Sequence, residues 1–385
     1  MRNIGSKPIH GWVKEHHWWF SDVAFPFLIT RVGLLFVGWL SALIAPAETM
    51  PARGWQFSPH RMLDIWGRWD TGWYISIVER GYSPSVNQFG QGNTAFFPLY
   101  PYLVKLVHSC IVPGRFQTRG TILLIGVLIS NVAFLGALTL LYLLARDEWA
   151  ESSVAKKAVF YLCVFPTGFV FSAFYTESLF LLLSVAAFYI AEKESWWLAG
   201  LAGGLTALTR ATGVLCAIPL GILYWKQKRR IRWDALSLGI IPAALLVLTV
   251  TLYTVTGDPW ELFNSHAGWN HELNWPWHAL FSFSSAGRTQ ALDKGMIVLF
   301  AALSLVALKE RLAYGIWALF NTALLLAIKG NPNHMTRYVS IAFPAFIVLA
   351  AWGEQNRRLH QTIVVAFAIT LSLLMALWCQ YYIAV

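Results

Sequence analysis

One carboxylate lies among aromatic side chains in a polar and charged stretch of a mostly apolar chain. Asp70 lies between Trp69 and Trp73, and Arg68 precedes it by two residues. A carboxylate can accept a proton from a hydroxyl nucleophile during group transfer, so Asp70 is a candidate catalytic base. The alternative is structural, because an ion pair with Arg68 or Arg80 would stabilise the loop.

Three further charged residues lie within apolar runs or at their ends. Arg210 and Arg337 are predicted to lie at or just inside one membrane face, where an arginine can bind an anionic ligand, although both could be ion-pair partners. Glu177 begins a predicted helix, where it either complements the helix dipole or contributes to the site. Weaker candidates for the base are Asp64, Asp258, Glu261 and Glu79.

The composition is that of a polytopic membrane protein. Hydrophobic residues make up 57% of the 385 residues and charged residues 12%, about half of the charged fraction of a soluble protein. The net charge of +10 does not indicate nucleic-acid binding. Much of it lies in short loops, where it indicates the orientation of the chain in the membrane. The four cysteines form no CxxC pair, so we expect no disulfide framework, no metal site and no cofactor.

Long apolar runs must supply the helices that position these residues in the lipid bilayer. A helix needs about 20 apolar residues to cross, and the runs predict about eleven crossings. The predicted spans are 25–46, 120–145, 158–173 with a break at Pro166, 177–192, 235–255, 294–308, 311–328, 337–352 and 361–383, with two more within 196–225. Arg31 is expected to extend its side chain from the first span to the cytoplasmic interface.

Residues 196–225 are too few for two full spans, although both of their ends should be cytoplasmic. The loop 226–232 that follows is the most basic in the chain, and lysines and arginines in short loops mark the cytoplasmic side. The spacing therefore predicts two short helices that meet near Arg210, at a break that lines a cavity in the protein.

Two long outer segments follow from this orientation. Residues 47–119 form the first non-cytoplasmic loop, which carries Asp70 and a short helix near 102–112. Residues 257–293 form a Trp-rich outer loop. The charged candidates therefore all project to the non-cytoplasmic side, and the chain is predicted to form one transmembrane domain, 1–385.

Two non-enzymatic interpretations remain open. A transporter or lipid flippase would also place charged residues in a membrane cavity, but it predicts internal repeats and charges that are accessible from both faces. The sequence has no clear repeat, and its charges favour one face. A non-catalytic membrane scaffold would use the arginines only as ion-pair partners.

Five motifs, in this order and spacing, resemble those of the PIG-V-like mannosyltransferases, which are related to GPI mannosyltransferase 2 and belong to the GT-C membrane glycosyltransferases. The motifs are Arg68-Trp-Asp-x-x-Trp-Tyr-x-x-Ile-x-x-x-Gly-Tyr82, Phe96-Phe-Pro-Leu-Tyr-Pro101, Phe165-Pro-x-x-x-x-x-Ser-x-x-Tyr-Thr-Glu-Ser178, Leu208-Thr-Arg-x-x-Gly213 and Arg337-Tyr338. The first and third are specific, whereas the fourth recurs in several GT-C groups. Residues 257–293 carry no matching motif, and the compact chain looks more bacterial than eukaryotic.

The resemblance implies a GT-C fold, an inverting transfer from a polyprenyl-phosphate donor, with mannose as the expected sugar, and a glycan or glycolipid acceptor. Asp70 is the only carboxylate at a matching position of the first motif, so the role of catalytic base falls to it. Because Arg210 and Arg337 lie where a lipid phosphate would sit, both are predicted to bind the donor phosphate.

The remaining predicted site residues are those expected to contact substrate: Arg68, Trp69, Trp73, Tyr74, Phe97, Tyr175, Glu177 and Tyr338. The expected location is a bacterial inner membrane with the site facing the periplasm, or the endoplasmic reticulum membrane in a eukaryote. Membrane lipids are the other expected partners.

Overall fold

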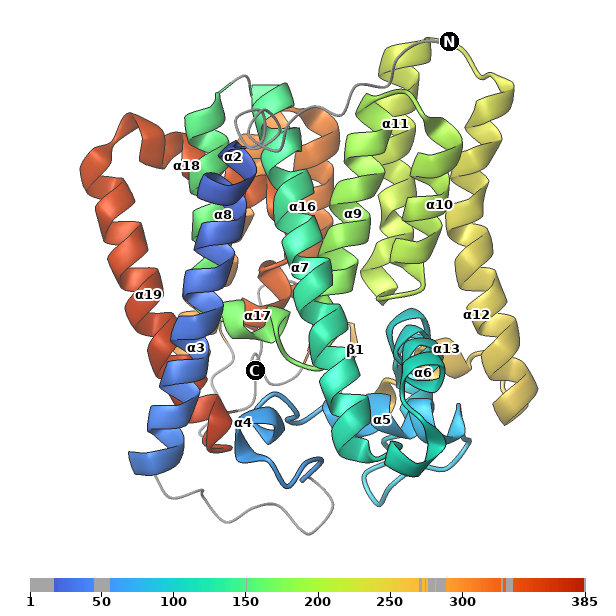
Figure 1. Cartoon of the computed structure of the whole chain (residues 1–385). Coiled ribbons are helices and arrows are strands. Elements are labelled where there is room, and N and C mark those ends of the chain that lie inside the picture. Colours follow the sequence, from blue (N-terminus) through green and yellow to red (C-terminus); the bar gives the residue numbers. More distant parts are fainter. Residues whose placement is uncertain are drawn as a thin grey trace, which may run out of the picture.

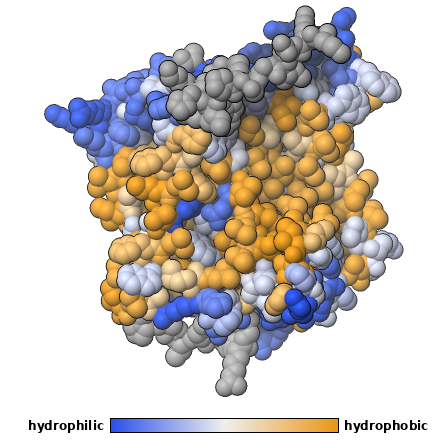
Figure 2. Space-filling view, in the orientation of Figure 1, coloured by the Kyte–Doolittle hydropathy of each residue, from blue (hydrophilic) through white to orange (hydrophobic). Residues whose placement is uncertain are grey.

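The described part of the chain is almost entirely helical (Figure 1). The structure is a computed structural model that describes residues 17–44, 56–149, 151–269, 272–273, 275, 281, 289–326, 328–329 and 335–383. Most helices run side by side between the two ends of the molecule, and several short ones gather at its lower end in Figure 1. Figure 2 shows an apolar belt between hydrophilic ends, which is the pattern of an integral membrane protein.

Five helical stretches among the described residues are long and apolar enough to cross a membrane. They are His17–Ile44, which ends in α3 (Phe25–Ile44), then α7 (Arg119–Trp149), Trp233–Thr256, which contains α12 (Ile240–Thr256), α15 (Gln290–Glu310) and α19 (Arg357–Cys379). Each coincides with a predicted span. The first helix begins earlier than predicted, because α2 (His17–Trp19) and the π-helical turn η1 (Phe20–Ala24) lead directly into α3.

Shorter helices complete the bundle. They are α8 (Ser152–Cys163), α9 (Glu177–Glu192), α10 (Trp196–Ala207), α11 (Ala217–Lys228), α16 (Leu312–Leu326), α17 (Met335–Val339) and α18 (Phe343–Gln355). Helix α9 packs against α7 and α10, and α15 packs against α16. Since these helices are shorter than a full span, the predicted number of about eleven crossings stays a prediction.

The break predicted at Pro166 within the span 158–173 is confirmed, but the segment is helical only to Cys163, where α8 ends. Pro166 lacks a backbone N–H and cannot continue the helix, and the chain then forms only the 3₁₀ turn η4 (Gly168–Phe171) before α9. Phe165, Phe169 and Tyr175 are fully buried. Irregular backbone at membrane depth is tolerated where protein surrounds it, and this segment meets that condition.

The two short helices predicted within 196–225 are confirmed. Helix α10 ends at Ala207, the 3₁₀ turn η5 (Ala211–Cys216) follows, and α11 begins at Ala217. The break depends on close backbone packing, because a Cβ atom at Gly213 would lie 2.3 Å from the carbonyl oxygen of Thr206. Arg210 therefore lies at the point where the chain turns between the two helices.

The segments predicted to be outer loops carry short helices, as expected for the first loop. These are α4 (Arg61–Asp64), α5 (Thr71–Arg80), the 3₁₀ turn η2 (Asn93–Ala95), α6 (Leu99–Ile111) and, after α12, α13 (Glu261–Asn264). Two short strands, β1 (Glu272–Leu273) and β2 (Ile328–Lys329), pair antiparallel. Residues 45–55, which include the start of the first loop, and much of the Trp-rich segment beyond residue 269 lie outside the described residues.

Arg31 does not extend to the interface as predicted, because its side chain turns into the protein. It is buried, its Nη1 donates to the carbonyl of Gly168 at 2.9 Å and to Ser172 Oγ at 3.1 Å, and its Nη2 donates to the carbonyl of Cys163 at 3.2 Å. Its guanidinium carbon lies 5.1 Å from the ring centroid of Phe134. Backbone carbonyl groups that lack helical partners where α8 ends thus accept hydrogen bonds from Arg31. If this side chain extended to the interface, those carbonyls would lose their donor.

The variant Arg31→Met should therefore be less stable than the parent protein by about 2–4 kcal/mol, because buried carbonyl acceptors lose their donor. Thermal unfolding of the purified protein in detergent measures this, and Arg357→Met, at an exposed residue of α19, is the control. Equal melting temperatures for the two variants would contradict the role given to Arg31.

Candidate functional site

Four charged side chains meet where α5, α9, α17 and the break between α10 and α11 come together. Arg337 Nη1 donates to Asp70 Oδ2 at 2.9 Å, and Arg337 Nε donates to Glu177 Oε1 at 2.6 Å. Arg210 Nη1 donates to the same oxygen of Glu177 at 2.5 Å. Two carboxylates and two guanidinium groups, from residues up to 267 positions apart, thus form one continuous network, which we call the Asp70–Arg337–Glu177–Arg210 network.

The members of this network differ in how far they are exposed. The side chain of Glu177 is fully buried and that of Arg337 is 4% exposed, whereas the side chains of Arg210 and Asp70 are 16% and 29% exposed. The inner pair is therefore enclosed by protein, and the outer pair can be reached by a ligand. The prediction that charged side chains of both signs lie close together is therefore confirmed.

Asp70 is held at the start of α5 but does not cap that helix with its side chain. Its carbonyl oxygen accepts the first helical hydrogen bond, from the N–H of Trp73 at 3.0 Å. Trp69 before it has a positive φ of 49°, which is rare for a residue with a Cβ atom, and its Nε1 donates to the carbonyl of Ile383. The strained turn leaves the carboxylate of Asp70 directed at Arg337.

Arg68 lies beneath this turn and does not contact Asp70. It is 3% exposed, its Nη1 donates to Asp64 Oδ2 at 3.1 Å, and its Nη2 donates to the carbonyl of Cys379 at 3.2 Å. The ion pairs considered for Asp70, with Arg68 or Arg80, are therefore wrong, because Asp70 pairs with Arg337 instead. The other oxygen of Asp64 accepts the N–H groups of Phe57 and Ser58, so Asp64 has a structural role.

Two tyrosine rings support the guanidinium groups. The guanidinium carbon of Arg337 lies 3.9 Å from the ring centroid of Tyr175, and that of Arg210 lies 5.1 Å from the ring centroid of Tyr338. The electron-rich face of an aromatic ring attracts such a cation. The hydroxyl of Tyr175 also donates to the carbonyl of Arg68 at 2.9 Å, which links the loop before α9 to the turn that carries Asp70.

The other aromatic residues that were predicted to contact substrate fall into two groups. Some lie near the network, and others pack against apolar residues elsewhere. Trp73 is partly exposed and stacks on Phe96, with 6.1 Å between the ring centroids. Tyr74 is buried, and burial, reinforced by the carboxylates of Glu177 and Asp70, raises the pKa of its phenol, so the hydroxyl stays neutral. Phe97 packs in a small apolar cluster with Leu248, Leu252 and Leu262.

The weaker candidates for the base have partners elsewhere in the structure. Glu261 Oε1 accepts a hydrogen bond from Thr94 Oγ1 at 2.5 Å, Asp258 accepts from the N–H of Trp260 at 2.8 Å, and Glu79 pairs with Arg119 at 2.7 Å. None of these three carboxylates belongs to the Asp70–Arg337–Glu177–Arg210 network as described.

Asp293 is a residue of this region that the sequence did not single out. It is buried in the first turn of α15, and its Oδ1 accepts from both the N–H and the hydroxyl of Thr336, at 2.7 and 2.6 Å. Thr336 directly precedes Arg337, so Asp293 holds the turn that presents this arginine. A carboxylate at the start of an apolar span could have marked Asp293 as a candidate. Its partner Thr336 lies 43 residues away, so the sequence alone did not indicate the contact.

The chain matches the family model described as Mannosyltransferase (PIG-V) over residues 43–255, which is more than half of its length. It is 25% identical over 224 residues to GPI mannosyltransferase 2 of Yarrowia lipolytica, in an alignment covering 58% of this chain and 57% of that protein. With GPI mannosyltransferase 2 of Schizosaccharomyces pombe it shares 26% identity over 159 residues, covering 41% and 32%. The alignments thus span from about a third to just over half of these relatives.

Two solved structures have a similar fold. ArnT from Cupriavidus metallidurans bound to undecaprenyl phosphate superposes with a TM-score of 0.51 at 13% identity, covering 97% of this chain and 76% of that one. The oligosaccharyltransferase AglB from Archaeoglobus fulgidus, in complex with an inhibitory peptide and a dolichol-phosphate, superposes with a TM-score of 0.50 at 15% identity, covering 96% and 55%. The chain therefore belongs to the PIG-V mannosyltransferase family, and its fold is the GT-C fold of membrane glycosyltransferases.

Proposed function

We propose that this protein transfers mannose from a polyprenyl-phosphate donor to a hydroxyl group of a glycan or lipid-linked acceptor on the non-cytoplasmic face of its membrane, with inversion at the anomeric carbon. Family membership and the mannosyltransferase relatives support the sugar. The polyprenyl and dolichol phosphates named with the two similar structures support the class of donor. The observation that carries the proposal is a partly exposed Asp70 carboxylate oriented by Arg337.

Asp70 is proposed to be the base. The acceptor hydroxyl attacks the anomeric carbon of the donor, its proton passes to the Asp70 carboxylate, and the bond from that carbon to the phosphate oxygen breaks. The bonding electrons leave with the lipid phosphate. A glycosidase needs a second carboxyl group to protonate an alcohol leaving group, but a phosphate leaves as an anion and needs none.

Arg210 is proposed to be the main contact of the donor phosphate. It is partly exposed, and its hydrogen bonds to Thr176 and Glu177 both use Nη1, so no hydrogen bond to another described residue uses its Nε or Nη2. These two nitrogens can form the bidentate fork that suits a phosphate. Developing charge on a leaving phosphate is stabilised by such preorganised donors.

Arg337 contributes to the same step from a more buried position. Its Nε and Nη1 already donate to Glu177 and Asp70, so a phosphate would have to share this cation with two carboxylates. Its proposed contribution is therefore to orient Asp70 and to add positive potential behind the phosphate. Trp73, beside Asp70, is proposed to line the sugar site.

The remaining predicted substrate contacts are proposed to act through these residues. Arg68 and Trp69 anchor the turn of Asp70 to backbone carbonyls near the end of α19. Tyr175 and Tyr338 support the guanidinium groups. Phe97 lies in an apolar cluster with α12 residues, so a contact with substrate there stays a prediction.

Asp70→Asn should lower the rate of transfer by about 10²- to 10⁴-fold, the usual contribution of a general base, while the protein still folds and binds donor. A base takes up its proton only as the transition state forms, so it adds little to ground-state binding. Purified protein with polyprenyl-phosphate mannose and a panel of acceptors measures turnover. Glu79→Gln removes a charge from the same helix and should leave turnover near the parent value. A folded Asp70→Asn variant with near-parent turnover would remove Asp70 from this role.

Arg210→Lys should weaken donor binding by about 10- to 100-fold, because a single ammonium group cannot replace a fork of two charged hydrogen bonds. Arg119→Lys is the matched control, since Arg119 is exposed and pairs with Glu79 away from the network. Donor affinity can be measured by titration into the purified protein. If both variants bind donor as the parent does, the role of Arg210 is confined to its ion pair with Glu177.

The outer face of the protein can be located with a cysteine at Ser85, an exposed residue of the first loop. In a background with Cys110→Ser, because Cys110 is itself exposed, Ser85→Cys should react with an impermeant thiol reagent in intact cells. Arg230→Cys, in the basic loop after α11, should react only after lysis. The reverse pattern would place the site on the cytoplasmic side and exclude the proposed donor arrangement.

A further inference from the structure

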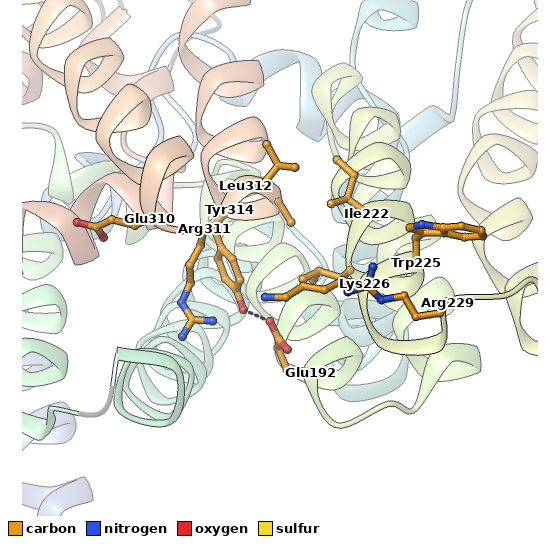
Figure 3. A pocket seen from close by; sticks show the side chains of 11 residues that line it. Glu192, Ile222, Trp225, Lys226, Arg229, Glu310, Arg311, Leu312 and Tyr314 are labelled. Carbon is orange, nitrogen blue, oxygen red and sulfur yellow. Dashed lines mark hydrogen bonds between the residues drawn. The ribbon is translucent and has the colours of Figure 1, made fainter.

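A cavity of about 310 Å³ lies at the other end of the bundle from the Asp70–Arg337–Glu177–Arg210 network (Figure 3). It is bounded by the ends of α9 and α11 and by the start of α16. Helix α9 begins at Glu177 in the network and ends at Glu192 in the cavity wall, a distance of about 22 Å along the helix axis. The cavity is therefore separate from the proposed active site.

The cavity walls carry charges of both signs. Lys226 and Arg229 project from the end of α11, and Glu192 faces them from the end of α9. Both cations are exposed, and in the described part of the chain their side chains form no hydrogen bond or salt bridge. A third cation, Arg311, is already paired with Glu148 at 2.5 Å.

Glu192 is placed to retain hydrogen-bonding capacity toward the cavity. Its Oε1 accepts from the hydroxyl of Tyr314 at 2.9 Å, and its Oε2 accepts a long contact from Gln227 Nε2 at 3.4 Å. A carboxylate offers about four acceptor positions. Glu192 can therefore accept further donors from a ligand while it keeps the contact with Tyr314.

The mouth of the cavity opens beside apolar surface. Trp225 and Leu312 line it and are 54% and 55% exposed, and α11 and α16 extend from it into the apolar belt of Figure 2. Tryptophan at such a boundary is typical of the membrane–water interface. A ligand in the cavity would thus have its polar part between the charges and an apolar part along the helices.

We propose that this cavity binds the headgroup of a phospholipid that carries both a phosphate and a primary ammonium group. Lys226 and Arg229 contact the phosphate, the ammonium group donates to Glu192, and the acyl chains follow the exposed faces near Trp225 and Leu312. A purely anionic headgroup would leave its charge facing Glu192. A trimethylated ammonium has no N–H to donate to that carboxylate.

The proposal can be tested on the purified full chain in mixed micelles, with native mass spectrometry to count the retained lipids. Phosphatidylethanolamine should be retained about tenfold more than phosphatidylcholine or phosphatidylglycerol, as expected for one or more charge-assisted hydrogen bonds. Lys226→Ala with Arg229→Ala should lower the retention of phosphatidylethanolamine by about tenfold or more, because its phosphate loses both cationic contacts. Arg357→Ala with Arg358→Ala removes the same charge from exposed positions of α19 and should leave it unchanged.

Glu192→Gln tests the ammonium contact separately. The amide can still accept from Tyr314 but carries no charge, so the preference for phosphatidylethanolamine over phosphatidylglycerol should be lost while a phosphate-bearing lipid is still retained. Equal retention of phosphatidylcholine by the parent protein would overturn the proposal, as would a preference for phosphatidylglycerol. Displacement of the lipid by inorganic phosphate would instead identify a site for the free anion and would equally overturn it.

Discussion

The fully buried carboxylate of Glu177 is the constraint on which the site depends. A buried charge is strongly unfavourable unless it is paired, and Glu177 is paired twice, with Arg337 Nε and Arg210 Nη1 on one oxygen. These two contacts fix the start of α9 to α17 and to the break between α10 and α11. Asp70 joins this arrangement only through Arg337, so the position of the proposed base depends on an acid whose own side chain is fully buried.

The irregular segments that carry the network are held in the same way, by buried charges that bond to backbone groups. Arg31 donates to carbonyls at the end of α8 and in η4, Arg68 donates to the carbonyl of Cys379 below the turn of Asp70, and Asp293 accepts from the N–H of Thr336 before Arg337. Backbone groups at this depth need partners within the protein. Because these buried side chains bond to backbone groups of the loops, the loops can be irregular and still be fixed.

The sequence predicted which residues form much of the site, but it did not predict which of their side chains pair with one another. The basic loop 226–232 required that the chain return within 196–225, which led to the correct break near Arg210. The partner of Asp70 could not be found in this way, because Arg337 lies 267 residues away and the neighbouring Arg68 is the more obvious choice. The break predicted at Pro166 is present, but the span 158–173 was predicted to be too long, since apolar composition does not distinguish a span from a buried loop such as the one after Pro166.

The pairing has a consequence for the proposed transfer. In the free protein the network holds two carboxylates and two guanidinium groups and is formally neutral. When the acceptor proton reaches Asp70, that side chain loses its negative charge at the same moment as the leaving phosphate gains one. The positive charge of Arg337, until then opposed by both Asp70 and Glu177, becomes less compensated and stabilises the phosphate together with Arg210. One fixed cation between the base and the phosphate can thus favour the transition state over the bound substrates, because its interaction with the phosphate strengthens only as the proton moves.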